Sequence, residues 1–168
     1  MKPFLHLGIR FDGKNLEVLD QRMLPDGEQW VRVDSPQTMI DLIQSLAVRG
    51  APLIGVAAAL SLALFRKKGG HIVETHEFGM ALRKARPTAV NLMWAMDRML
   101  KTLDLRPEIL LATADAILNE EVLRSEGMAK MGSQLIQDGE NILTHCNTGG
   151  LATVGVGTAL GVIRRAHE

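Results

Sequence analysis

Three short stretches of the sequence combine residue types that could bind or transform a charged small molecule. The first is Arg49-Gly50-Ala51-Pro52. A helix that begins at this proline points its free N–H groups back toward Gly50 and Ala51, and such a helix end attracts anions. Gly50 lets a ligand approach the backbone, and Arg49 adds a guanidinium with paired donors. An ordinary link between two helices, with Arg49 at the end of the first, fits the same residues.

The second stretch is Arg86-Pro87-Thr88. Arg86 stands just before the predicted start of a helix, where a positive charge is mildly unfavourable. A bound anion would remove that conflict. The alternative interpretation is an arginine on the surface that water solvates.

The third stretch is Cys146 followed by Asn147-Thr148-Gly149-Gly150. Cys146 ends a predicted strand, and in open α/β sheets ligands bind beyond the carboxyl ends of the strands. A polar, glycine-containing turn into a helix can cradle an oxyanion, so Cys146 could face the ligand and move a proton. An inert core cysteine is the alternative. His145 is assigned to packing or support, because consecutive strand residues point to opposite faces.

Cofactor and metal sites are not expected. The glycines Gly155, Gly157 and Gly161 fall inside a predicted helix with G-x-G-x-x-x-G spacing, so they indicate close packing rather than a dinucleotide site. One cysteine and five scattered histidines have no spacing typical of metal ligands.

Composition excludes several classes of partner. Lys+Arg and Asp+Glu both number 19, which argues against a broad nucleic-acid surface. The longest apolar stretch, residues 51–65, is shorter than the roughly 20 residues that span a bilayer, so it predicts a buried helix and no membrane contact. The N-terminus lacks the features of a signal peptide. We therefore expect a cytoplasmic protein.

These candidate residues need elements to position them. Residues 7–19 alternate around Asp12-Gly13, a strong hairpin signal, and a turn at 25–27 precedes an apolar run over 29–33. A small antiparallel sheet of about three strands is predicted. Helices are predicted over 36–50 with Ser35 as N-cap, 52–65, 72–84, from Pro87 with a stripe of Leu92, Met96, Met99 and Leu103, and from Pro107 to about Gly139.

The pattern changes after Gly139. Residues 141–146 predict a buried strand, and residues 151–165 predict a helix rich in small residues. A single β–α step cannot form a parallel sheet, which needs neighbouring strands and cover on both faces. The fold class expected is α+β leading into α/β. It comprises a sheet-plus-helical N-terminal domain over 1–139 and the first β–α unit of a truncated Rossmann-like domain over 140–168.

Three segments together resemble the methylthioribose-1-phosphate isomerase family. They are residues 49–59 (RGAPLIGVAAA), 86–92 (RPTAVNL) and 142–164 (ILTHCNTGGLATVGVGTALGVIR). The family also includes other pentose-phosphate isomerases and the regulatory subunits of translation initiation factor two B. Where it often has Gly-Ala-Leu, this chain has Gly149-Gly150-Leu151.

The resemblance implies a role for each matching residue. Arg49, Gly50, Ala51 and Arg86 would bind the substrate, largely its phosphate, and Cys146 would be catalytic. The family's proton-donating Asp matches no residue here. The implied reaction converts 5-methylthioribose-1-phosphate to 5-methylthioribulose-1-phosphate in methionine salvage, without a cofactor.

Two alternatives remain open. One is an isomerase of another pentose-1-phosphate, such as 5-deoxyribose-1-phosphate. The other is a noncatalytic regulatory subunit that binds sugar phosphates or nucleotides. The resemblance also implies a homodimer for the complete enzyme, with this chain as its N-terminal part. The partners expected are a sugar phosphate and the C-terminal segment of the same enzyme. The isolated chain is expected to expose apolar surface and to aggregate or require that partner.

Overall fold

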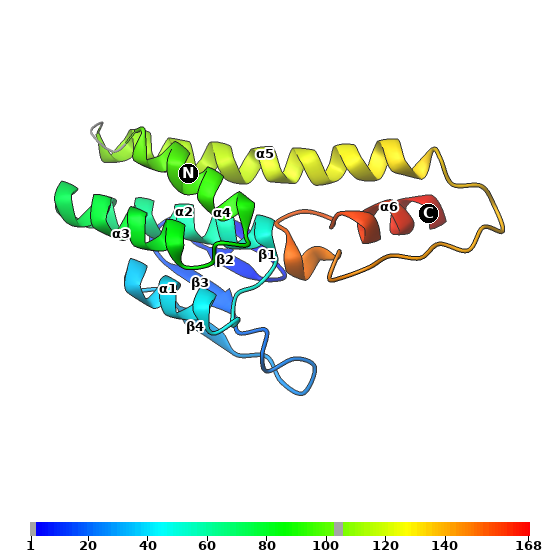
Figure 1. Ribbon diagram of the computed structural model, residues 1–168, viewed down its shortest axis with the longest axis horizontal. Coiled ribbons are helices and arrows are strands. Elements are labelled where there is room, and N and C mark those ends of the chain that lie inside the picture. Colours follow the sequence, from blue (N-terminus) through cyan, green and yellow to red (C-terminus); the bar gives the residue numbers. More distant parts are fainter. Residues whose placement is uncertain (1–2, 103–105) are drawn as a thin grey trace.

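The computed structural model describes residues 3–102 and 106–168. Within these residues a four-stranded antiparallel sheet and six α-helices form an α+β fold (Figure 1). The strands pair in chain order: β1 (Phe4–His6), β2 (Ile9–Phe11), β3 (Leu16–Leu19) and β4 (Trp30–Arg32). The helices are α1 (Pro36–Gln44), α2 (Ala51–Lys67), α3 (Ile72–Lys84), α4 (Val90–Leu100), α5 (Pro107–Ser133) and α6 (Ala159–His167), with a short 3₁₀ helix η1 (Gly150–Ala152) before α6.

The predicted hairpin is confirmed as β2 and β3. Its turn is held by the Asp12 carboxylate, which accepts hydrogen bonds from the Asn15 side chain and from the backbone N–H groups of Asn15 and Lys14. These bonds, that from the Asn15 side chain most of all, lower the pKa of Asp12 to about 2. The strand β1 adds a fourth member to the sheet. It has three residues, too few to show an alternating pattern in the sequence.

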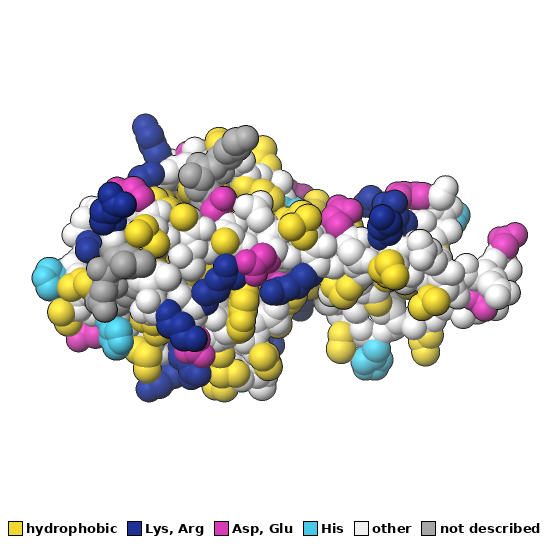
Figure 2. Space-filling view, turned by 90° about the horizontal axis from the view of Figure 1, so that it is seen from above, with side chains coloured by type: hydrophobic (Ala, Val, Ile, Leu, Met, Phe, Trp, Pro, Cys, Tyr) yellow, Lys and Arg dark blue, Asp and Glu magenta, His cyan; other side chains and the backbone are white. Residues whose placement is uncertain are grey.

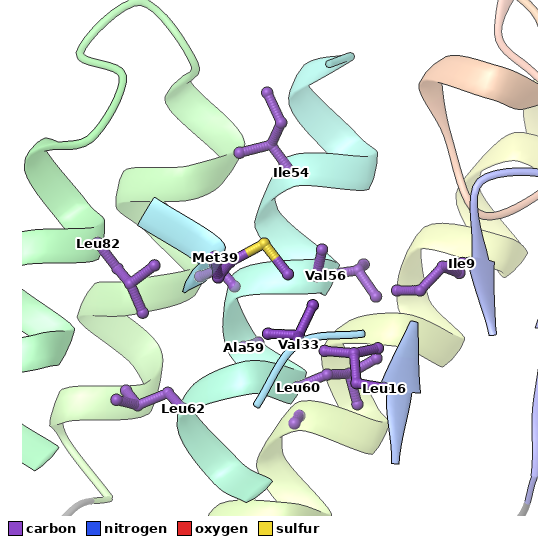
Figure 3. Close-up of a cluster of buried hydrophobic side chains, with 14 of the residues drawn as sticks. Ile9, Leu16, Val33, Met39, Ile54, Val56, Ala59, Leu60, Leu62 and Leu82 are labelled. Carbon is purple, nitrogen blue, oxygen red and sulfur yellow. The ribbon is translucent and has the colours of Figure 1, made fainter. Parts of the chain in front are cut away.

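Helix α2 forms the centre of the core. Every residue from Leu53 to Leu64 is buried, because the sheet and α1 cover some of its faces and α4 and α5 cover others. Figure 3 shows side chains of α2 meeting Ile9 and Leu16 from the sheet, Met39 from α1 and Leu82 from α3. The prediction of a buried helix is confirmed. Across residues 3–102 and 106–168, no helix is long and apolar enough to cross a membrane.

Several predicted helix ends are wrong by a few residues. Helix α1 begins after its Ser35 cap as predicted but ends at Gln44, short of residue 50. Leu46 follows it with a φ of 62°, which a right-handed helix does not contain. Helix α4 begins at Val90 instead of Pro87, because a turn bonds the Ala89 N–H to the Arg86 carbonyl. Helix α5 ends at Ser133, short of Gly139. Leu103 of the predicted stripe lies outside the described residues.

The predicted strand over 141–146 is wrong, and the predicted helix over 151–165 is confirmed only in part. The segment 141–146 is an exposed chain, because the part of the protein that the structure describes supplies no strand beside it. The helix is limited to η1 and α6. Between them Gly157 adopts a φ of +102°, which lies outside the range of a right-handed helix, so the helix is interrupted there.

The C-terminal region forms a narrow arm beside the end of α5. Helix α6 lies along the C-terminal half of α5, and residues 134–149 loop out around it (Figure 1). Close contacts join the two helices, since a Cβ on Gly132 would lie 2.7 Å from the Val162 side chain. Hydrophobic side chains are exposed on this arm (Figure 2), among them Leu135 and Leu143. Leu143 is 96% exposed, in keeping with the expected apolar surface.

Candidate active site

The five predicted site residues line a single pocket of about 350 Å³. Such a volume falls within the range of small-molecule sites. The five come from three separate parts of the chain, brought together by the packing of α2, α4 and the segment before η1. The residues that line the pocket are Arg49, Gly50, Ala51, Ile54, Arg86, Thr88, Ala89, Cys146 and Asn147.

The start of α2 forms one side of the pocket. Gly50 is its N-cap residue with a φ of +95°, a conformation that favours glycine. The Ile54 N–H is bonded to the Gly50 carbonyl, and Pro52 has no N–H, so Ala51 and Leu53 carry the helix's first free N–H groups. Within the described residues, no side chain caps this helix end. The end is therefore open to an anion.

The start of α4 and Arg86 form a second side. Thr88 and the N-cap residue Ala89 line the pocket, and this helix end likewise has no side-chain cap in the described part of the chain. Arg86 is half-buried, and its Nη1 atom is buried without a hydrogen-bond partner among residues 3–102 and 106–168. A buried guanidinium N–H that lacks an acceptor is costly, and an anionic ligand would supply one.

Cys146 and Asn147 form the third side. Cys146 is exposed and has a φ of 64°, a left-handed conformation that costs a residue with a Cβ about 1–2 kcal/mol. The loop is held from behind, where the Thr158 N–H donates to the Thr148 carbonyl at 2.8 Å. Strained backbone of this kind is found at functional sites, so the conformation agrees with a role for the thiol.

The charges around the pocket favour an anionic ligand. Two arginines and two helix N-termini face it, while the nine described residues of its lining include no carboxylate. A phosphate could take bonds from backbone N–H groups and guanidinium groups together. Cys146 would lie next to whatever group the phosphate carries. The arrangement therefore suits a small phosphorylated molecule with its reacting part near a thiol.

Sequence reasoning left some of this site unassigned. Ile54 and Ala89 line the pocket without having been predicted as ligand-binding residues. Their apolar side chains carry no chemical signal. Thr88 and Asn147, which stand in two of the predicted stretches, also line the pocket. His145 is exposed and lies outside the described lining of the pocket. No group of three or more His, Cys, Asp or Glu residues in the described chain could hold a metal ion.

Comparison with known protein families gives a match over most of the chain. Residues 47–168 match the Initiation factor 2 subunit family. This match includes every residue of the pocket.

Curated relatives carry one common name. A methylthioribose-1-phosphate isomerase from Klebsiella pneumoniae (strain 342) is 45% identical over 170 residues, which cover 100% of this chain and 50% of the relative. One from Yersinia pestis (strain Pestoides F) is 46% identical over 156 residues, 91% of this chain and 45% of the relative. The chain thus spans about half the length of the curated relatives it matches.

Two solved structures have the same fold over nearly the whole chain. The 5-methylthioribose 1-phosphate isomerase from Pyrococcus horikoshii OT3 superimposes with a TM-score of 0.87 at 32% identity, covering 97% of this chain and 49% of that one. The delta subunit of translation initiation factor eIF-2B from A. fulgidus has a TM-score of 0.79 at 35% identity. The match covers 97% of this chain and 51% of that one.

Proposed function

The chain belongs to the Initiation factor 2 subunit family, and on that premise we propose that it supplies the phosphate-binding and cysteine side of a sugar-phosphate isomerase site. The substrate proposed is 5-methylthioribose-1-phosphate and the product is 5-methylthioribulose-1-phosphate. The observation that carries the proposal is the convergence of Arg49, Arg86 and Cys146 on one pocket between two helix N-termini. The names of relatives at 45% identity support the choice of reaction.

The reaction sets clear chemical demands. The sugar carries phosphate on its anomeric oxygen, so the ring opens only if an acid protonates the ring oxygen, and a hydrogen must then pass between C2 and C1. In our proposal Arg49, Arg86 and the two helix ends hold the phosphate. Cys146 assists proton movement at the adjacent carbons. An Asp beyond the residues of this sequence would act as the acid.

We also propose that residues 140–168 begin a Rossmann-like domain. The segment 141–146 exposes Ile142 and Leu143, an apolar pair that suits a buried strand between neighbours. The relatives are about twice as long as this chain. A polypeptide equivalent to their second half is the partner that we propose for this segment. From the family resemblance we further propose a homodimer of the complete enzyme. The cytoplasmic location expected from the sequence also stays a proposal.

A regulatory, noncatalytic subunit is the second candidate function. The likeness to the eIF-2B delta subunit, at 35% identity and a TM-score of 0.79, favours it. Its pocket would bind a sugar phosphate or nucleotide without converting it. An isomerase of another pentose-1-phosphate remains a variant of the first candidate.

Ketose formation from 5-methylthioribose-1-phosphate tests the proposal. The assay uses this chain alone and then with the second half of the Klebsiella relative added as a separate polypeptide, with co-sedimentation to verify association. The isomerase is supported if the two polypeptides together form ketose and neither does so alone. A folded, associated pair that binds the sugar phosphate but forms no ketose supports the regulatory subunit.

A further inference from the structure

Gln21 lies outside the pocket and bonds to two of the three chain segments that form it. It follows β3, is 3% exposed, and lies outside the described lining of the pocket. Its backbone N–H donates to the Ala47 carbonyl at 2.9 Å, and its side-chain Nε2 donates to the Leu151 carbonyl at 2.8 Å. Ala47 lies two residues before Arg49, and Leu151 lies five residues after Cys146. One buried residue thus bonds to two of the three chain segments that carry the site, the segment of Arg49 and the segment of Cys146.

The identity of the amide atom at Leu151 follows from chemistry. A carbonyl oxygen only accepts hydrogen bonds, so the amide group that faces Leu151 must be the donor, Nε2. The Oε1 atom of Gln21 is buried and unpartnered within the described part of the chain. The side chain therefore donates to Leu151 through Nε2 while its own acceptor, Oε1, stays without a partner in the described residues.

The two segments are in tight contact where Gln21 holds them. A Cβ on Gly50 would lie 2.4 Å from the Cα of Ala152, the residue after Leu151. A second bond from the sheet holds the same segment, between His6 Nε2 and the Gly155 carbonyl at 3.0 Å. His6 of β1 and Gln21, which follows β3, therefore both bond to the chain after Cys146.

We propose that Gln21 is a positioning residue for the pocket, setting the distance between the Arg49 segment and the Cys146 segment. This inference rests on the proposed anion site. Without the Nε2 donor, the partly buried Leu151 carbonyl loses its hydrogen bond, and the segment shifts to find another donor. Cys146 and Asn147 then move relative to the helix end at Ala51, which weakens binding of the anion between them.

Alkylation of the single cysteine measures how strongly the pocket binds an anion. Cys146 is the one cysteine of the chain, so its rate of reaction with iodoacetamide reports on the pocket alone. Bound phosphate disfavours the thiolate and shields it, so inorganic phosphate should slow the reaction of the unchanged chain. Gln21→Met keeps the length of the side chain without the donor and without a buried charge. In this variant, the phosphate concentration that halves the alkylation rate of Cys146 should be about five- to tenfold higher. That is the effect expected for the loss of one hydrogen bond.

Controls separate positioning from general stability. Val31→Ala in β4 weakens the sheet without touching either segment, and should lower the melting temperature while leaving the protecting phosphate concentration unchanged. If Gln21→Met changes the protecting phosphate concentration no more than Val31→Ala does, the positioning role is wrong. If phosphate does not slow the alkylation of Cys146 in the unchanged chain, the proposed anion site is wrong, and so is the positioning role that rests on it.

Discussion

Gly50 and Ala152 are in contact without room for a side chain between them. A Cβ built on Gly50 would lie 2.4 Å from both the Cα and the carbonyl oxygen of Ala152. Gly50 also has a φ of +95°, which residues with a Cβ rarely adopt. The start of α2 and the chain after Cys146 can therefore meet this closely because residue 50 is glycine.

Gly50→Ala should destabilise the protein by about 2–4 kcal/mol, since it combines backbone strain with overpacking. Urea unfolding followed by circular dichroism measures the change. Gly127→Ala is the matched control, because a Cβ at Gly127 meets nothing within 4 Å among the described residues. Inside helix α5 that substitution should stabilise by about 0.5–1 kcal/mol. Equal effects at the two glycines would contradict the close contact.

Arg86→Ala should weaken binding of a sugar phosphate at least about tenfold, the loss that one charge-assisted hydrogen bond gives. Stability should be unchanged or slightly higher, because the variant removes a buried N–H group that has no partner in the described structure. Isothermal titration and thermal melting give the two quantities. Arg165→Ala, at an exposed position of α6, is the control and should change neither. A large loss of stability with unchanged affinity would assign Arg86 to the fold instead.

Cys146→Ala should lower kcat by about 10²–10⁴-fold in the assay with both polypeptides, the range for a group that assists proton transfer. Affinity for the sugar phosphate should remain, because the arginines and helix ends that hold the phosphate are intact. Activity that survives the substitution would exclude Cys146 from proton movement and leave it as a lining residue.

The protonation of His6 should make stability depend on pH. Burial lowers the pKa of His6 below its usual 6.5, so the folded protein favours the neutral ring. Above pH 6.5 both states hold the neutral ring and His6 adds no pH dependence. As pH falls below 6.5, the unfolded chain binds the proton first, and the free energy of unfolding decreases until the folded-state pKa is passed.

Urea unfolding at pH 7.5 and pH 5.5 tests this effect. His6→Gln keeps a side-chain donor for the Gly155 carbonyl but does not titrate. The wild-type chain should lose more stability between the two pH values than the variant does. An equal loss in both would place the titration elsewhere.

The helical core could be predicted because its signals are local. Ser35 and Pro36 mark the start of α1, and the unbroken apolar run of α2 marks a buried helix. The candidate site residues were marked by equally local signals, since glycine, proline and arginine at a helix start are typical of anion binding. The structure brings Arg49, Arg86 and Cys146 to one pocket. Their roles in binding and catalysis stay predictions.

The chain after Gly139 could not be predicted from the same signals. Ile142 and Leu143 have the composition of a buried strand, but a strand is stable only beside another, and the described residues offer none there. Gln21 was missed because its partners lie 26 and 130 positions away. Contacts over such separations depend on the finished fold and leave no periodic pattern.

In our proposal, the N-terminal ends of α2 and α4 together bind the phosphate of a sugar phosphate. The most direct test is an ¹⁵N NMR titration of this chain with 5-methylthioribose-1-phosphate and, separately, with unphosphorylated 5-methylthioribose. We predict that the phosphorylated sugar shifts the amide signals of Ala51, Leu53 and Val90, while those of Arg10 and Glu17 on the sheet stay in place. The unphosphorylated sugar should leave all of them unchanged. Shifts confined to other parts of the chain, or equal shifts with both sugars, would contradict the claim.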